Sequence, residues 1–285
     1  DELQITVHVV KQSPDIAQGV DTGGAGDQGI MYGYATDETP ERMPKAVVLV
    51  HKLTQGLENL RNSGRANWLR PDGKAQVTME EGKIKTILIS TQHAAEISQE
   101  EIKTTLIREL ITPLVSSLEG IEVLTNPTGR FVQGGFEADT GLTGRKIMVD
   151  TYGGLIPHGG GAFSGKDPSK VDRSAAYMAR FVANTLVARG LARKCFVSVA
   201  YAIGRAEPVM VEAIDQYGNS LADVVHKEFD FRPQAIIERL ALRRPIYEPT
   251  ASYGHFGKRG LPWEMVEETP RATQANTQQF ATATR

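Results

Sequence analysis

One stretch, residues 159–174, constrains this chain more than any other, because a glycine-rich turn there runs directly into a helix start. It reads Gly-Gly-Gly-Ala-Phe-Ser-Gly-Lys-Asp-Pro-Ser-Lys-Val-Asp-Arg-Ser. Glycine backbone lets a chain approach a ligand closely. Free N–H groups at a helix start attract anions, and the ammonium groups of Lys166 and Lys170 add positive charge. The stretch therefore predicts an anion site, and a polyphosphate is the ligand that suits it.

Two plainer interpretations of this stretch are weaker. Residues 160–166 fit the P-loop pattern G-x-x-x-x-G-K, but Asp167 stands where a P-loop needs Ser or Thr to hold magnesium. A glycine turn before a solvated helix start explains Asp167 and Pro168, yet it leaves three consecutive glycines beside Lys166 and Lys170 unexplained. Lysines four residues apart on a helix repel each other slightly, so an anion between them is favoured.

The bulk composition bounds the class of protein. The chain has 285 residues, of which 40% are hydrophobic and 23% charged, as in a globular protein with a substantial core. A net charge of −2 argues against a nucleic-acid-binding surface, and no apolar run approaches the ~18 residues of a membrane helix. The single cysteine, Cys195, lies in an apolar run and is expected in the core. Because one cysteine excludes a disulfide framework within the chain, we expect a reducing, cytoplasmic location.

Periodicity predicts strands at 3–10, 30–35, 74–80, 84–91, 121–126, 131–134, 147–152, 196–203 and 209–214. It predicts helices at 44–63, 98–114, 168–187, 221–229 and 232–240. Asp167 is expected to cap the third helix, with Pro168 at its first position. Residues 11–29 are expected to form a loop, and the polar repeats from Thr269 a disordered tail. The layout indicates an α+β fold with antiparallel or mixed sheets and helices on one face.

The string Gly-Leu-Thr-Gly-Arg-Lys at 141–146, with Asp139 before it, is a second candidate for charge chemistry. By itself it is explained by a basic strand edge, where charge deters aggregation. Together with the lysines of the glycine-rich stretch, it makes a cluster of four cations. The six histidines show no metal-ligand spacing, although His158 directly precedes the glycines and could touch a ligand.

Three further strings carry weaker signals. Trp-Leu-Arg-Pro-Asp-Gly-Lys at 68–74 contains a turn that needs no functional explanation. Gly-Ala-Gly-Asp-Gln-Gly at 24–29 is a flexible loop whose Asp27 could reach a sugar hydroxyl or a cation. Asn-Pro-Thr-Gly-Arg-Phe at 126–131 is most simply a turn, although Phe131 could stack on a base and Arg130 could meet a phosphate.

Taken in chain order, and with Tyr-Gly-His-Phe-Gly at 253–257, these strings resemble the S-adenosylmethionine synthase (methionine adenosyltransferase) family. The resemblance runs from about Lys11 to Trp263, and its most specific parts are the glycine–lysine string and Gly-Ala-Gly-Asp-Gln-Gly. It implies that ATP, L-methionine and water give S-adenosylmethionine, phosphate and pyrophosphate. The methionine sulfur would attack the ribose C5′ atom and expel triphosphate, which is then hydrolysed before release.

The resemblance also assigns residues to the two substrates. A thioether is neutral, so the first step needs alignment and charge stabilisation on the triphosphate rather than a general base. The catalytic cations would be Lys74, Arg145, Lys146 and Lys166. The ATP site would consist of Asp27, Asp72, Gly73, Lys74, Arg130, Phe131, Asp139, Arg145, Lys146, Ala162 and Lys166. The methionine site would consist of Gln12, Asp139 and Lys170.

Cofactors, a lid and assembly are implied in the same way. Two Mg²⁺ ions per site would bridge phosphate oxygens, with Asp172 at a matching metal position, and K⁺ is a further family cofactor. Active sites in the family lie between two subunits, so a homodimer with shared sites, and usually a homotetramer, is expected. A mobile lid that excludes water matches Gln12, Ser13, Pro14, Asp15, Ile16, Ala17, Gln18, Gly19, Val20 and Asp21.

The implied architecture is three interleaved two-layer α/β domains with pseudo-threefold symmetry, the middle one incomplete here. Family members carry roughly ninety further residues before the point that matches Asp1, on the scale of a small domain, with a catalytic histidine and a magnesium-ligand aspartate. The implied division is a first domain at 38–134, a middle-domain remnant at 1–16 and 135–174, a C-terminal-type domain at 17–37 and 175–268, and a disordered tail at 269–285.

Two alternatives stay open at this point. One is a catalytically impaired or regulatory subunit or fragment of the same family, which the absent histidine and aspartate favour and the retained cations oppose. The other is an unrelated P-loop phosphotransferase. The chain also departs from the family at Phe136-Glu137-Ala138, where a proline and a glycine are usual at the edge of the pocket.

Overall fold

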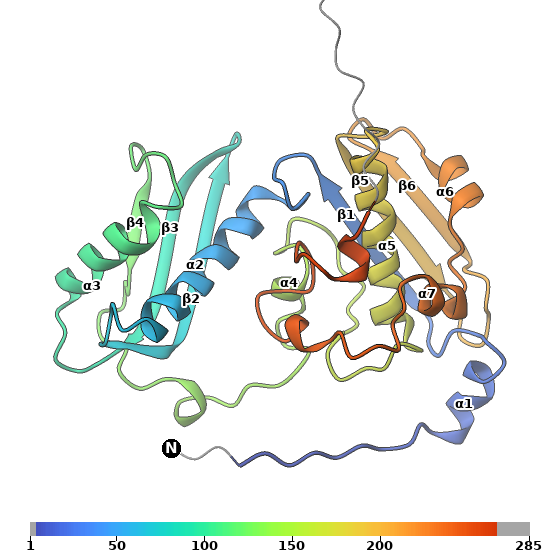
Figure 1. Ribbon diagram of the computed structural model, residues 1–285, viewed down its shortest axis with the longest axis horizontal. Coiled ribbons are helices and arrows are strands. Elements are labelled where there is room, and N and C mark those ends of the chain that lie inside the picture. The colour runs from blue at the N-terminus through green and yellow to red at the C-terminus, as the bar shows by residue number, and fades with distance from the viewer. Residues whose placement is uncertain (1–3, 267–285) are drawn as a thin grey trace, which may run out of the picture.

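The computed structural model describes residues 4–266 and contains two separate three-stranded sheets with helices packed on them (Figure 1). This confirms the mixed α+β architecture predicted from the sequence. The pseudo-threefold arrangement and the domain division stay predictions. None of the helices within residues 4–266 is both long enough and apolar enough to cross a bilayer.

The first sheet is antiparallel throughout, with the order β1 (Gly29–Thr36), β5 (Lys194–Tyr201) and β6 (Met210–Asp215). Helix α5 (Val171–Ala188) packs against β1 and β5 and buries most of its length (Figure 1).

Close contact between α5 and this sheet depends on one glycine. A Cβ atom on Gly33 of β1 would lie 2.0 Å from the carbonyl carbon of Ala179, so any larger residue would push the helix away. Cys195 of β5 is fully buried in the same core, as predicted, and burial raises the pKa of its thiol to about 12.

The second sheet combines an antiparallel hairpin with a parallel strand, in the order β2 (Leu69–Glu80), β3 (Lys83–His93) and β4 (Glu122–Thr125). Glu81 and Gly82 join the hairpin with φ values of 49° and 75°, as a tight two-residue turn requires. The core of this lobe includes residues of α2 (Lys45–Asn62) and α3 (Gln99–Leu106), and its fully buried members include Leu53, Leu60, Ile87, Ile89, Ile102 and Leu106.

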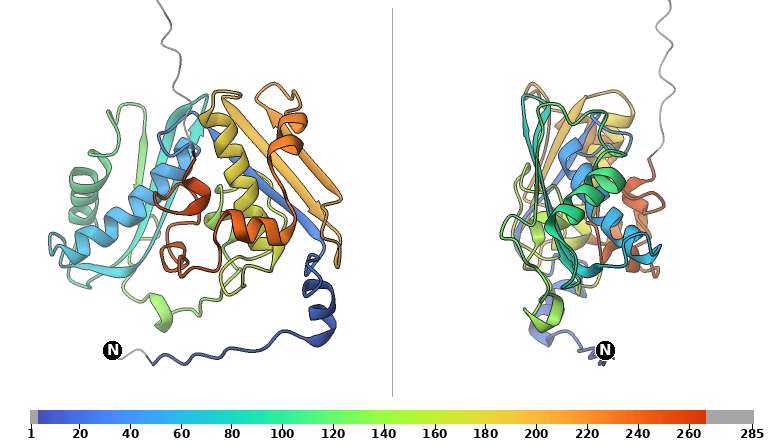
Figure 2. Two further views of the ribbon diagram at one scale, coloured as in Figure 1. Left: turned by 45° about the vertical axis from the view of Figure 1, so that its right-hand side comes forward. Right: turned by 90° about the vertical axis from the view of Figure 1, so that its left-hand side faces the viewer.

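Short elements connect and flank the two sheets (Figure 2). A π-helical turn at Ile107–Ile111 directly follows α3, so the helix predicted to run to residue 114 changes its hydrogen bonding part-way. The other short helices are α1 (Pro14–Val20), α4 (Ile147–Asp150), α6 (Ala222–Glu228), α7 (Pro233–Arg239) and the 3₁₀ turns Gly135–Glu137, Glu248–Thr250 and Pro262–Glu264.

Three strand predictions are wrong. Residues 4–10 are extended, but they pair with no strand of either sheet and run along one edge of the molecule (Figures 1 and 2), leaving Val9 93% exposed. Residues 131–134 form no strand, and the Phe131 N–H donates to the His93 ring instead of to a neighbouring strand. Residues 147–150 are the helix α4, closed by a hydrogen bond from Thr151 Oγ1 to the Ile147 carbonyl oxygen.

Two further boundaries differ from expectation. The supposed loop at 11–29 contains α1, and α5 starts at Val171 instead of residue 168. Asp167 therefore caps a turn, accepting the Ser169 N–H at 2.8 Å, and does not cap the helix itself. The tail predicted from Thr269 lies outside the described residues.

A buried ion pair ties α5 to the C-terminal segment. Arg180 and Glu264 have side chains 0% and 7% exposed and share two hydrogen bonds, of 2.9 and 2.6 Å. The same guanidinium donates to the carbonyl oxygens of Tyr34, Glu41 and Arg42. All its donors are thus used to hold β1, the loop after it and residue 264 around one helix.

Glu264→Gln should lower the free energy of unfolding by about 3 kcal/mol, because it leaves the buried guanidinium without its counter-charge. Denaturant unfolding followed by circular dichroism measures this. Glu228→Gln, which breaks the half-exposed pair with Arg189, is the matched control and should cost much less. Equal losses in the two variants would contradict the central role of the buried pair.

Candidate functional site

The glycine-rich stretch forms a loop that lies between β1 and the start of α5, and residues 159–170 are called the glycine loop below. A Cβ on Gly159 would sit 1.8 Å from the carbonyl oxygen of Ile30, and one on Gly161 would sit 2.0 Å from Asp172 Oδ1. Both positions therefore need glycine for contact with neighbouring atoms. The close approach to a ligand stays a prediction, because the atoms approached here belong to the protein itself.

Two lysines of the glycine loop have polar partners. Lys166 Nζ lies 2.8 Å from Asp172 Oδ2, and this pair is partly shielded, with side chains 33% and 18% exposed. Lys170 Nζ donates to Gln12 Oε1 at 2.5 Å and also lies close to Gly26. The residues predicted for methionine and for the lid, Lys170 and Gln12, are thus in direct contact.

The string at residues 141–146, called the basic turn below, packs against the glycine loop. Thr143 Oγ1 donates to the Ser164 carbonyl oxygen at 3.3 Å, and a Cβ on Gly144 would lie 2.9 Å from Ala162 Cβ. Arg145 and Lys146 follow this contact and are exposed. Folding therefore brings together two cation-bearing strings that lie about 20 residues apart, and the four-cation cluster itself stays a prediction.

The Gly-Ala-Gly-Asp-Gln-Gly loop borders the same region. Gly24 packs against the backbone of Gly19 and Gly204. A Cβ added at Gly24 would lie only 2.5–2.6 Å from their carbonyl oxygens. Asp27 is exposed and accepts the Gln28 N–H at 2.8 Å. The Asp27 carboxylate is thus accessible to solvent beside the loop that carries Lys170.

A second group of predicted residues lies on β2 and in the segment that follows β4: Asp72, Gly73, Lys74, Arg130 and Phe131. The supposed turn at 71–73 is part of β2, with a register shift between Leu69 and Gly73. Asp72 Oδ2 accepts the Gly135 N–H at 2.9 Å, so this group contacts the segment that leads to Asp139, which is exposed. Lys74 and Arg130 are exposed as well.

His93 organises this second group, and no pattern in the sequence singled it out. It is 2% exposed, and its Nε2 accepts the Phe131 N–H at 3.0 Å while its backbone N–H donates to the Phe131 carbonyl oxygen at 2.9 Å. Its position at the end of β3, opposite Leu69, holds Phe131 beside the register shift.

The two groups stay apart within this chain. In residues 4–266, no hydrogen bond or ion pair joins a side chain of the glycine loop or basic turn to Lys74, Arg130 or the ring of Phe131. The convergence of all the cations on one ligand stays a prediction.

The comparisons with known proteins agree with each other. The S-adenosylmethionine synthetase central domain matches residues 22–131, and the S-adenosylmethionine synthetase C-terminal domain matches residues 133–265. The S-adenosylmethionine synthases of two Thermus thermophilus strains are each 51% identical over 297 residues, which is 94% of this chain and 75% of theirs. The Deinococcus deserti synthase is 49% identical over 310 residues, 95% of this chain and 77% of its own.

The chain belongs to the S-adenosylmethionine synthase family. The resemblance drawn from the motif strings is thereby confirmed, and the family's enzymes are methionine adenosyltransferases. The models that match are those of the central and C-terminal domains.

Magnesium fits this site as an ion shared with phosphate and not as an ion enclosed by protein. The described residues contain no group of three or more His, Cys, Asp or Glu side chains placed to hold a metal. Mg²⁺ is commonly held by one or two carboxylates together with phosphate oxygens. Asp172, on the first turn of α5 beside Lys166, is one such carboxylate at the glycine loop.

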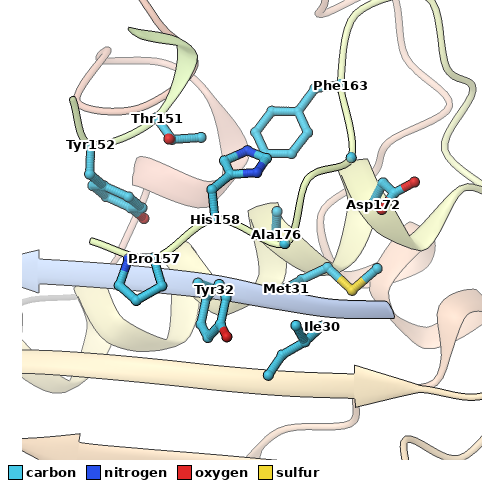
Figure 3. A pocket seen from close by; sticks show the side chains of 12 residues that line it. Ile30, Met31, Tyr32, Thr151, Tyr152, Pro157, His158, Phe163, Asp172 and Ala176 are labelled. Carbon is cyan, nitrogen blue, oxygen red and sulfur yellow. The ribbon is translucent and has the colours of Figure 1, made fainter. Parts of the chain in front are cut away.

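A small hollow of about 20 Å³, room for about one water molecule, lies beneath the glycine loop (Figure 3). His158, Phe163 and Asp172 are among the residues that line it. His158 Nδ1 accepts the Gly160 N–H at 2.8 Å, and its ring stacks on Phe163. Burial lowers the pKa of His158, partly offset by Asp172, so this histidine shapes the loop as a neutral acceptor.

An aromatic cluster supports the loop from below. Phe163 contacts Tyr177, His255 and Phe256, and Tyr177 stacks on Trp263 at 3.7 Å. His255 Nδ1 lies 2.7 Å from the Tyr177 hydroxyl, and burial lowers the pKa of His255 to about 3. The string around His255 was part of the family resemblance but had no assigned role, because only the fold brings it under residue 163.

His255→Gln should reduce the pH dependence of stability. The unfolded chain takes up a proton on this histidine near pH 6.5, whereas the folded chain stays neutral there until about pH 3. Stability therefore falls as the pH drops below 6.5, by ~1.4 kcal/mol per pH unit for one proton. Urea unfolding between pH 7 and pH 5 measures the slope.

In His255→Gln, the slope of unfolding free energy against pH should be smaller by the contribution of this one proton. His51 and His158, whose pKa values burial also lowers, contribute equally to both proteins and cancel in the difference. Identical slopes in parent and variant would contradict a buried neutral His255.

Proposed function

We propose that this chain carries the chemistry of S-adenosylmethionine synthesis from ATP and L-methionine. The observation that carries the proposal is the contact pattern of the glycine loop, on a chain of this family. Lys166 beside Asp172 suits a polyphosphate, and Lys170 with Gln12 suits the polar end of an amino acid. Two substrate sites would thus lie four residues apart on one rigid segment.

The proposed reaction begins with attack of the neutral methionine sulfur on the ribose C5′ atom, which expels triphosphate. Negative charge grows on the leaving oxygen, and Lys166, Arg145 and Lys146 would stabilise it. The bound triphosphate would then be hydrolysed to phosphate and pyrophosphate. Mg²⁺, with Asp172 as a ligand, would neutralise phosphate charge during this step, and K⁺ is a further expected cofactor.

The remaining ATP residues would come from a second copy of the chain. Asp72, Gly73 and Lys74 lie on β2, and Arg130 and Phe131 follow β4; within residues 4–266 none of them forms a side-chain hydrogen bond or ion pair with the glycine loop. A homodimer in which the sheet of one copy faces the glycine loop of the other would complete the nucleotide site, with Asp27, Asp139 and Ala162 at its edge. A homotetramer would contain two such pairs.

The lid is proposed to be residues 12–21, which include α1. Gln12 and Lys170 would hold methionine where they now contact each other, so substrate binding would replace their mutual hydrogen bond. Closure would exclude water from the reacting sulfur. The expected setting is the cytoplasm, without nucleic-acid or membrane partners.

Lys170→Ala and Lys166→Ala should separate the two substrate sites. Lys170→Ala should weaken methionine binding by at least about tenfold and leave ATP binding nearly unchanged, because it removes one charge-assisted contact. Lys166→Ala should do the reverse. Calorimetry with ATP and with methionine, together with chromatographic measurement of S-adenosylmethionine, tests both.

Lys227→Ala, an exposed lysine on α6, is the control and should match the parent. Loss of ATP binding alone in Lys170→Ala would contradict the proposal and favour a P-loop phosphotransferase. If the parent binds both substrates but forms no S-adenosylmethionine, the chain is a catalytically impaired or regulatory member of the family.

A further inference from the structure

Arg173 lies directly behind the glycine loop, in the first turn of α5, and is 5% exposed. Its Nη1 donates to the Lys166 carbonyl oxygen at 2.9 Å, its Nε to the Tyr177 hydroxyl at 3.0 Å, and its Nη2 to Thr250 Oγ1 at 3.2 Å. All three acceptors are neutral oxygens. The guanidinium thereby connects the loop, the helix and the C-terminal segment at one point.

No carboxylate forms an ion pair with Arg173 anywhere in residues 4–266. Its charge is instead covered by the face of Tyr247, whose ring centre lies 4.1 Å from the guanidinium carbon. Arg180, seven residues later on the same helix, pairs instead with Glu264. The two buried arginines of α5 therefore differ in one respect: only Arg180 has its charge neutralised locally.

A buried cation without a counter-charge costs free energy, and an anion placed nearby lowers that cost. The loop in front of Arg173 presents Lys166 and Lys170 and already suits a polyphosphate. A polyphosphate bound in front of the loop would offset the positive charge of Arg173, which lies behind the loop. The low dielectric constant between the two strengthens their attraction. Binding of the anion and burial of the arginine are thus expected to stabilise each other.

The hydrogen bond to the Lys166 carbonyl adds a geometric effect. Lys166 stands at the end of a turn in which its own N–H donates to the Phe163 carbonyl oxygen at 3.1 Å. Arg173 fixes the carbonyl on the other side of the same residue. The backbone of Lys166 is therefore held at both ends, and its ammonium group pairs with Asp172.

We infer that Arg173 is a positioning residue for the polyphosphate: from behind the loop it fixes the backbone of Lys166 and supplies a buried positive charge that the bound anion compensates. Tyr177 and Thr250 hold the guanidinium in this orientation. The inference rests on the proposed function, because it needs a polyphosphate at the glycine loop.

The test compares Arg173→Lys and Arg173→Gln with the parent chain, using inorganic tripolyphosphate in calorimetry. Arg173→Lys keeps the charge but loses the planar guanidinium that makes the three hydrogen bonds. It should weaken tripolyphosphate binding about tenfold. Arg173→Gln also loses the charge and should weaken it further. In turnover assays, the KM for ATP should rise about tenfold in Arg173→Lys while the KM for methionine stays within about twofold.

Arg180→Lys is the matched control, since it changes an equally buried arginine on the same helix. It should lower the melting temperature and leave tripolyphosphate affinity unchanged, which separates positioning from general stability. Tyr177→Phe keeps Arg173 in place, removes one acceptor, and should weaken tripolyphosphate binding about threefold. If Arg173→Lys does not fold, the tripolyphosphate affinity of Tyr177→Phe tests the inference in its place.

Parental tripolyphosphate affinity in both Arg173→Lys and Tyr177→Phe would overturn the inference and leave the proposed function standing. A parent chain that binds neither tripolyphosphate nor ATP would overturn the proposed function and this inference with it. Equal losses in Arg173→Lys and Arg180→Lys would show a structural role only and would also overturn it.

Discussion

The glycine loop can lie where it does only because two of its residues, Gly159 and Gly161, have no side chain. Gly159 passes the backbone of β1, and Gly161 passes Asp172 on α5, each at a distance that a single methyl group would prevent. The loop is therefore held between a strand and a helix start that are themselves fixed by α5 packing on the sheet through Gly33. A change in how α5 lies on β1 would move every charged group on the loop at once.

Charge is layered around this loop. Lys166 and Lys170 stand on it, Arg145 and Lys146 follow a turn packed against it, and Arg173 is buried behind it. Asp172 is the carboxylate in ion-pair contact with one of these five cations within residues 4–266. Local placement gathers these five cations around one loop although the whole chain has a net charge of −2, and Asp167 and Asp172 lie among them.

Much of the fold could be predicted from periodicity, since β1, α2, the β2–β3 hairpin, β5, β6 and the helices α6 and α7 lie close to their expected positions. Two of the wrong strand predictions have different causes. Residues 4–10 alternate as a strand does, but alternation does not supply a hydrogen-bonding partner. Residues 147–150 are apolar enough for a strand, but the bond from Thr151 back to Ile147 closes a helical turn there. Among site residues, His93, Arg173 and Tyr177 were missed because their importance comes from contacts with residues far away in the sequence, such as Thr250, 77 positions after Arg173, and His255, 78 positions after Tyr177.

The single thiol of the chain gives the β1–β5–β6 lobe a built-in reporter. Cys195 is fully buried on the central strand, and its raised pKa leaves almost no thiolate at neutral pH. An alkylating reagent can reach this sulfur only when the helix above the sheet opens, so the labelling rate follows that opening. If a ligand bound at the glycine loop slows the alkylation of Cys195, the size of that change measures how much the ligand rigidifies the β1–β5–β6 lobe.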